Sequence, residues 1–194
     1  QYEDAITNFN KAIELKPDYA EAYSNRGNTL NELGKSKEAI VDHKKAIELK
    51  YDYAEAYSNL GNAFNELGKY EEAIASYKQA IDFKADYAEA YSNLGNALYE
   101  LGRHENAIAS YNKAIDLKPE YAEAKYNLGN VLNEIERYYE AITCYEKAIE
   151  VRPDYAEAYQ NLGITLHNIG KYRKAIASFE KAAELKPDFS IAVA

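Results

Sequence analysis

The chain contains few of the residues that interrupt helices or build special sites. Among its 194 residues there is one cysteine, Cys144, with no tryptophan, no methionine, four prolines and nine glycines. A single cysteine excludes an internal disulfide and a metal site made of several cysteines. The sequence has no run of 18 apolar residues and no basic segment followed by an apolar one. It therefore predicts neither a membrane span nor a signal peptide.

Positive charge and catalytic motifs are also scarce. Lysine and arginine number 23 against 32 acidic residues, a net charge of -9, which argues against nucleic acid as a partner. No glycine-rich phosphate loop, HExxH or GxSxG motif is present, so we expect no enzyme and no cofactor. Because no targeting or membrane segment is present, a cytoplasmic protein is the default expectation, although the sequence itself identifies no compartment.

The glycines and prolines fall on three positions of one 34-residue register. If Ala20 is position 1, glycine occupies positions 8 and 15, and proline occupies position 32. Gly and Pro are the strongest local breaks in backbone structure, so their confinement to one register indicates one repeated structural unit. The register gives a half repeat at 1–19, full repeats at 20–53, 54–87, 88–121, 122–155 and 156–189, and the start of another at 190–194.

Each repeat contains two helical patterns of about four turns. In the first, apolar or small residues occupy positions 4, 7, 8 and 11, as in Tyr91, Leu94, Gly95 and Leu98. In the second they occupy positions 17, 20, 21, 24, 27 and 28. These spacings place the apolar residues on one face of a helix. The sequence thus predicts two amphipathic helices in every repeat.

The residues at the helix ends predict how the helices start and stop. Gly at position 15 suits a left-handed cap after the first helix, and Pro at position 32 ends the second. An Asp at position 33 followed three residues later by Glu resembles a capping box, in the pairs Asp18/Glu21, Asp52/Glu55, Asp86/Glu89 and Asp154/Glu157. Gly at position 8 lies inside a helix, which requires a packing reason. We expect close approach of a small partner, the Ala at position 20 or 27.

The unit resembles the tetratricopeptide repeat (TPR), whose pattern has an aromatic at position 4, Leu at 7, Gly at 8, Ala at 20, an aromatic at 24, Ala at 27 and Pro at 32. The resemblance covers the whole chain. It implies an all-α fold, a right-handed α-solenoid superhelix of tandem antiparallel helix pairs, forming one domain over residues 1–194. The first helix of each pair would line a concave groove.

Departures from the family pattern concentrate in the first full repeat. Arg26 replaces Leu at position 7 and His43 replaces the aromatic at position 24. We expect His43 to stand in for a core aromatic, this repeat to pack more loosely, and Arg26 to lie close to His43. The histidines lie at different register positions and do not converge on a metal site. Cys144, beside the core Tyr145, is expected to be a half-buried structural thiol.

Asparagines recur on the polar face of the first helix, which comprises positions 2, 5, 6, 9, 12 and 13. An amide offers both a donor and an acceptor, so a column of them suits an extended peptide backbone. Similar ladders hold substrate backbone in the TPR region of O-linked sugar transferases. Alternatively, these amides bond neighbouring helices to each other. The predicted peptide-binding residues are Asn25, Asn28, Asn59, Asn62, Asn93, Asn96, Asn127, Asn130 and Asn161.

Acidic residues follow the amides at position 13, in Glu32, Glu66, Glu100 and Glu134. They either give the groove a negative rim or are simply solvated. If they form a rim, Glu66, Glu100 and Glu134 are also predicted binding residues. The Lys and Arg clamp that TPR modules use for acidic chaperone tails is missing. The expected partner is therefore a neutral to basic, extended protein segment, with no nucleic acid and no membrane.

The sequence favours a protein-interaction scaffold that binds such a peptide along the groove. One alternative is the substrate-recruiting arm of an O-linked glycosyltransferase whose catalytic domain lies outside this chain. Another is an assembly scaffold that stacks on itself, because uncapped repeat ends leave apolar helix faces open. We accordingly expect end-to-end contacts between copies.

Overall fold

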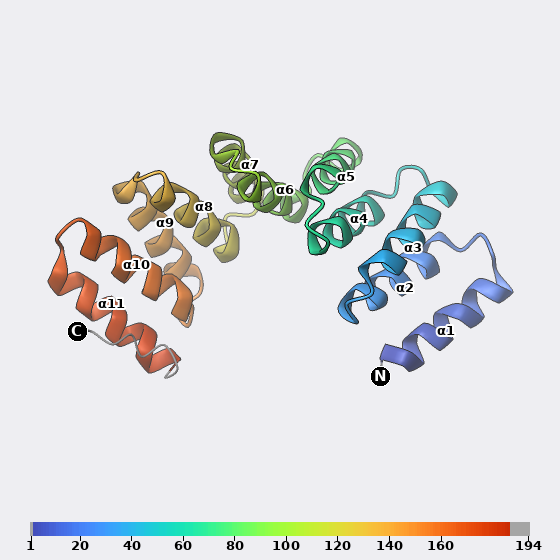
Figure 1. The fold of residues 1–194 in the computed structure, drawn as a ribbon, viewed down its shortest axis with the longest axis horizontal. Helices are drawn as coiled ribbons and strands as arrows, with labels where there is room; N and C mark the ends of the chain where they lie inside the picture. The colour runs from blue at the N-terminus through green and yellow to red at the C-terminus, as the bar shows by residue number, and fades with distance from the viewer. Residues whose placement is uncertain (1, 187–194) are drawn as a thin grey trace. The chain divides into compact units, whose positions relative to one another are not determined.

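The computed structural model describes residues 2–186, and every element in that part of the chain is an α-helix. The helices are α1 (Tyr2–Leu15), α2 (Ala20–Glu32), α3 (Ser36–Leu49), α4 (Ala54–Glu66), α5 (Tyr70–Phe83), α6 (Ala88–Glu100), α7 (His104–Leu117), α8 (Ala122–Glu134), α9 (Tyr138–Val151), α10 (Ala156–Asn168) and α11 (Tyr172–Leu185) (Figure 1). The predicted all-α repeat fold is confirmed.

The helix boundaries follow the 34-residue register. In each full repeat the first helix has 13 residues and the second has 14, as in α4 and α5. The predicted start of a further repeat at 190–194 and Pro187 lie outside the described residues. By its contacts the chain divides into two compact units, residues 1–102 and 103–194. Each is described by itself, and a single solenoid domain over 1–194 stays a prediction.

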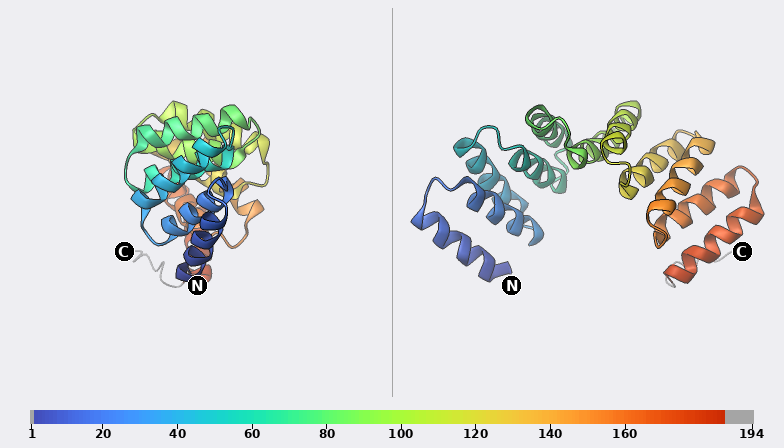
Figure 2. Two further views of the ribbon diagram at one scale, coloured as in Figure 1. Left: turned by 90° about the vertical axis from the view of Figure 1, so that its right-hand side faces the viewer. Right: turned by 180° about the vertical axis from the view of Figure 1, so that it is seen from behind.

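Within each unit, every helix packs on its neighbours in sequence. In the first unit α2 packs on α3 and α4 on α5, and the second helix of one pair packs on the first helix of the next (Figure 2). The second unit repeats this order from α7 to α11. The first helices of consecutive pairs also touch, α2 with α4 and α8 with α10. Side chains on consecutive first helices within one unit can therefore contact each other.

Small side chains at fixed positions allow these helices to approach closely. The alanines at positions 3, 20 and 27 are almost completely buried in every full repeat, as Ala56, Ala73 and Ala80 show in the second. The aromatic at position 24 fills the space between them, and Tyr77, Tyr111 and Tyr145 are the largest fully buried side chains of the described chain. His43 is buried in the same place, as predicted for a stand-in aromatic.

The glycine at position 8 faces this buried ring and not an alanine. A Cβ on Gly61 would lie 2.5 Å from Cε1 of Tyr77, and one on Gly129 would lie 2.6 Å from Cε1 of Tyr145. Real Cβ atoms do not approach so closely, so the ring requires glycine opposite it. The prediction of a small alanine partner is wrong, because the space that glycine leaves is used by an aromatic.

The glycine at position 15 has the predicted left-handed conformation. Gly34, Gly68, Gly102 and Gly170 have φ values between 67° and 74° and close each first helix. In the fourth full repeat Glu136 takes the same conformation, with φ of 62°. The turn therefore keeps its geometry even where its residue carries a side chain.

The predicted capping boxes are not formed. Each first helix starts one residue later than that pattern requires, so Tyr19, Tyr53, Tyr87, Tyr121 and Tyr155 occupy the N-cap position, without a side-chain cap bond. The glutamate in the first turn of α2, Glu21, interacts with Lys50 and not with the backbone of Asp18. The pKa of Glu21 is lowered by its own backbone N–H and by Lys50.

Candidate functional site

The predicted amides of the first unit include a hydrogen-bonded network that joins two repeats. Asn62 on α4 accepts two hydrogen bonds on its Oδ1, from the hydroxyl of Tyr77 at 2.9 Å and from Nδ2 of Asn93 at 3.0 Å. Tyr77 belongs to α5 and Asn93 to α6. Both lone pairs of this amide oxygen are thus occupied, and Asn62 retains only its N–H donors.

The second unit repeats this arrangement at the same register positions. Asn130 accepts from the hydroxyl of Tyr145 and from Nδ2 of Asn161, both at 2.9 Å. The same Nδ2 of Asn161 lies 3.0 Å from the hydroxyl of Tyr126. We call Tyr77–Asn62–Asn93 and Tyr145–Asn130–Asn161 the amide networks. They correspond to the structural alternative weighed for these asparagines, in which amides bond neighbouring helices.

The remaining predicted amides differ in their surroundings. Asn96 and Asn127 are half-buried. Asn25 and Asn28 are exposed and Asn59 is half-buried, and in the described residues no hydrogen bond of these three amide side chains is found. The side-chain hydroxyl that bonds to Asn25 is that of Thr29, which donates to the backbone oxygen of Asn25 at 2.9 Å and leaves its amide side chain untouched. The predicted column therefore contains two kinds of amide, bonded within the fold and available to a ligand.

Not all of the predicted polar face is accessible. Position 5 is buried in the first three full repeats, at Ser24, Ser58 and Ser92. The position-13 carboxylates Glu32, Glu66, Glu100 and Glu134 are all exposed. One of them, Glu134, lies 3.5 Å from Nε2 of His104. The structure thus places the amides and the carboxylates on the first helices and leaves the carboxylates in solvent.

Arg26 bonds Asp42, the residue before His43, and not His43 itself, which is fully buried. Its guanidinium forms a bidentate pair with the buried Asp42, with Nε to Oδ2 at 2.7 Å and Nη2 to Oδ1 at 2.6 Å. Its Nη1 also donates to Oδ1 of Asn10 on α1, at 2.7 Å. This cluster fixes α1 against α2 and α3, because a buried carboxylate needs its charged partner.

His43 is enclosed by apolar surroundings beneath Gly27. Both of its ring nitrogens are buried without a hydrogen-bond partner. Burial lowers the pKa of His43 to about 4, against a smaller opposing effect of the Asp42 charge. The imidazole is therefore neutral near pH 7. Its one remaining N–H has no acceptor, so it makes no hydrogen bond to Asn28.

A recurrent contact that the sequence analysis missed lies at the start of each first helix. The cation at position 31 stands over the ring of the tyrosine at position 34, for example Lys50 at 4.6 Å from the centre of Tyr53. The same cation reaches the glutamate at position 2, with Lys50 at 3.4 Å from Glu21 and Lys186 at 2.9 Å from Glu157. The sequence contains a pattern that could have predicted this contact. A Lys or Arg precedes a Tyr by three residues at the end of each repeat, from Lys16 before Tyr19 to Arg152 before Tyr155.

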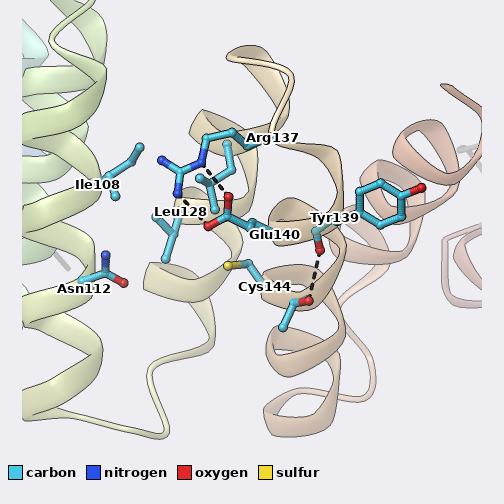
Figure 3. A pocket seen from close by; sticks show the side chains of 9 residues that line it. Ile108, Asn112, Leu128, Arg137, Tyr139, Glu140 and Cys144 are labelled. Atoms are coloured by element: carbon cyan, nitrogen blue, oxygen red, sulfur yellow. Dashed lines mark hydrogen bonds and ion pairs between the residues drawn. The ribbon is translucent and has the colours of Figure 1, made fainter. Parts of the chain in front are cut away.

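A hollow of about 390 Å³ opens between α7, α8 and α9 in the second unit. Its walls are largely apolar, and the Sγ of Cys144 points into it, with the Arg137–Glu140 pair at its edge (Figure 3). The same register positions line a hollow of about 350 Å³ in the first unit, where Arg26 and Asp42 stand in place of Leu128 and Cys144. None of the predicted site residues lines either hollow.

Cys144 has the surroundings of a structural thiol. Its side chain is half-buried, and burial raises its pKa to about 11. Reactive cysteines have a lowered pKa, so this thiol is a weak nucleophile near pH 7. In residues 2–186 no three His, Cys, Asp or Glu side chains gather in a way that would hold a metal ion, and no described helix is long and apolar enough to cross a membrane.

Comparison with known proteins identifies the repeat. A family model for the TPR repeat matches residues 1–34, 27–65, 61–102 and 95–135, and a model described as tetratricopeptide repeat matches residues 120–188. A search of curated proteins returns no match.

Solved structures share the fold. The crystal structure of MamA is 31% identical over 84% of this chain and 95% of that chain, with a TM-score of 0.77. YrrB, described as a TPR protein with an unusual peptide-binding site, is 28% identical over 93% of both chains, with a TM-score of 0.72. PilF of Pseudomonas aeruginosa has the same fold, at 24% identity over 85% of this chain and 75% of that one, with a TM-score of 0.79. The chain belongs to the tetratricopeptide repeat family.

Proposed function

We propose that this chain is a non-catalytic protein-interaction scaffold that binds an extended peptide segment along the asparagine-bearing faces of its first helices. Membership of the TPR family supports the scaffold role. The similarity to YrrB, a structure described by its peptide-binding site, supports a peptide as the ligand. Fold alone does not assign function, so the proposal depends on the chemistry of these faces.

The observation that carries the proposal is the set of accessible amides at positions 6 and 9. Asn25, Asn28 and Asn59 each present one acceptor and one NH₂ group with no hydrogen bond inside the described chain. A peptide backbone alternates N–H and C=O groups, and an amide side chain pairs with both kinds. Such contacts would hold an extended segment of varied sequence, because they do not depend on its side chains.

The exposed carboxylates bias the choice of peptide. Glu32, Glu66 and Glu100 follow the amides at position 13 and all three are exposed. Together with the net charge of -9 they favour neutral or basic segments over acidic ones. The partner we propose is therefore a protein with an extended, neutral to basic segment.

A peptide-display selection on the wild type and on the variant Asn25→Ala/Asn28→Ala/Asn59→Ala tests this function. We expect the wild type to enrich extended peptides with few acidic residues and the variant to lose them while it stays folded by circular dichroism. Asn106→Ala, which removes an exposed amide from the second helix α7, is the matched control and should keep the wild-type selection. Enrichment of the same peptides by the triple variant, or of none by the wild type, would overturn the proposal.

A further inference from the structure

The residue at position 24 determines whether the amide at position 9 is held inside the fold. Where position 24 is a tyrosine in the amide networks, position 9 is an asparagine that accepts its hydroxyl, as in Tyr77 with Asn62. In the fifth full repeat position 24 is Phe179, which has no hydroxyl, and position 9 is the apolar Ile164. Phe179 occupies the same packing site, because a Cβ on Gly163 would lie 2.6 Å from its Cε1.

The first full repeat departs from this pairing. Its position 24 is His43, yet its position 9 is an asparagine, Asn28. Asn28 is exposed, and in the described residues it makes no side-chain hydrogen bond, either to His43 or to Asn59 of the next repeat. The hydrogen bond that explains an asparagine at Asn62 and Asn130 is therefore missing at Asn28, and the fold does not account for an asparagine there.

The shape of the imidazole explains the difference. The hydroxyl of Tyr77 extends beyond the ring to reach Asn62 at 2.9 Å, whereas the His43 ring lies beneath Gly27 with both nitrogens buried and unpaired. A buried polar group without a partner destabilises the fold, so native structures rarely keep one without a reason. Here its effect is to leave the amides of Asn28 and Asn59 unbonded.

We propose that His43 is a positioning residue for the peptide: because it does not bond Asn28, the amides of Asn28 and Asn59 stay open and form the anchoring subsite. This inference rests on the proposed function and assigns the peptide contact to the first two full repeats. Asn62 and Asn93 hold consecutive repeats together and contribute little to the ligand. The ligand of the subsite is an extended peptide backbone, and Glu32 and Glu66 on the same two helices favour a cationic side chain beside it.

The chemistry of the two amide sets differs in a way that matters for a backbone. The Oδ1 of Asn62 is doubly occupied, so it offers a ligand no acceptor. Asn28 and Asn59 retain both the oxygen and the NH₂ group, and each can accept a peptide N–H while donating to a peptide C=O. His43 is a positioning residue in this scheme, because it acts only through Asn28.

The variant His43→Tyr tests the inference by installing the missing hydroxyl. Its ring has a template in Tyr77, and the new hydroxyl should bond Oδ1 of Asn28, which in turn should accept from Asn59. We expect the melting temperature to rise and the affinity for a fluorescein-labelled peptide, enriched on the wild type by display, to fall about tenfold, as expected for one or two lost hydrogen bonds. His43→Phe fills the site without a hydroxyl and should keep the wild-type affinity.

Single alanine variants separate this inference from the proposed function. Asn28→Ala and Asn59→Ala should each weaken peptide binding several-fold with little change in melting temperature, and Asn62→Ala should lower the melting temperature with little change in affinity. If the peptide binds but Asn62→Ala weakens it as much as Asn28→Ala does, or if His43→Tyr binds as the wild type does, the anchoring subsite is wrong while the scaffold function stands. If display on the wild type enriches no peptide, both fail.

Discussion

Glu136 occupies a backbone conformation that suits glycine. Its φ of 62° matches the value of 67° at Gly68 and Gly102 in the equivalent turns. This conformation destabilises a residue with a Cβ by about 1–2 kcal/mol, so replacing it with glycine removes that strain. Part of the resulting gain in stability is offset, because glycine is more flexible in the unfolded chain. We expect Glu136→Gly to raise the free energy of unfolding by about 0.5–1 kcal/mol, measured by urea denaturation.

The reciprocal change serves as the control for this turn. Gly68→Glu places the same side chain in the same backbone conformation. A Cβ at this position would meet no other side chain within 4 Å, so a steric clash does not contribute to the effect. It should lower stability by an amount similar to the gain in Glu136→Gly. An unchanged stability in both variants would show that the turn tolerates a side chain without strain.

His43 makes the stability of the fold depend on pH. Its pKa is about 4 in the folded chain and about 6.5 when unfolded. The unfolded chain therefore binds the proton more strongly between these values, and stability falls as the pH decreases from about 6.5 toward 4. At pH 5 the loss from this group should be about 2 kcal/mol relative to pH 7.

Urea denaturation of the wild type and of His43→Phe at both pH values measures this loss. The carboxylates and other histidines titrate in both proteins, so the difference between them isolates His43. We expect the wild type to lose about 2 kcal/mol more than His43→Phe between pH 7 and pH 5. Equal losses would mean that the ring is hydrated or paired in solution.

Between elements, one hydrogen bond distinguishes otherwise equivalent helix contacts. The hydroxyl of Thr165 on α10 lies 2.9 Å from Oδ1 of Asn133 on α8 and 2.8 Å from the backbone oxygen of Asn161, and it shares its one proton between these two acceptors. The same positions of the first unit hold Ala63 on α4 and Asn31 on α2, two helices that touch, and Oδ1 of Asn31 is buried with no partner. The α2–α4 contact therefore lacks a donor that the α8–α10 contact has.

We expect Ala63→Thr to stabilise the first unit by about 0.5–1 kcal/mol in thermal or urea unfolding, because the new hydroxyl satisfies a buried acceptor. The fully buried Thr165 shows that this position accommodates the larger side chain. Ala63→Val is the isosteric control and should not stabilise, since it adds the same volume without a donor. A gain in the valine variant would mean that packing alone, and not the bond, improves the contact.

Helix positions were predictable from the sequence, and the partners of several side chains were not. Helix bounds follow from the 3.6-residue period and from Gly68 and its equivalents, which are local signals. The ring of Tyr77 opposite Gly61, or Asp42 as the partner of Arg26, depends on which faces meet in three dimensions. The amides were found as a column from their spacing alone. Their division into bonded and unbonded members depends on the length of the side chain at position 24, which spacing does not reveal.

At the scale of the whole molecule, charge should set the choice of ligand more than its affinity. The chain carries 32 acidic and 23 basic residues, and the position-13 carboxylates are exposed. Exposed charges at low salt act over long distances, since the screening length is about 30 Å at 0.01 M and about 3 Å at 1 M. Backbone hydrogen bonds to amides carry no net charge and should respond weakly to salt.

This contrast gives a test with two matched peptides of the display-selected sequence, one with an added lysine and one with an added glutamate. We expect the lysine peptide to bind several-fold more tightly at low salt and the difference to shrink toward none at about 1 M salt, where screening is nearly complete. Glu32→Gln/Glu66→Gln should reduce the low-salt difference, and the exposed pair Glu71→Gln/Glu72→Gln on α5 should leave it unchanged. A preference that persists at high salt, or that survives removal of Glu32 and Glu66, would assign charge selection to other residues and leave the amides as the only recognition chemistry of these faces.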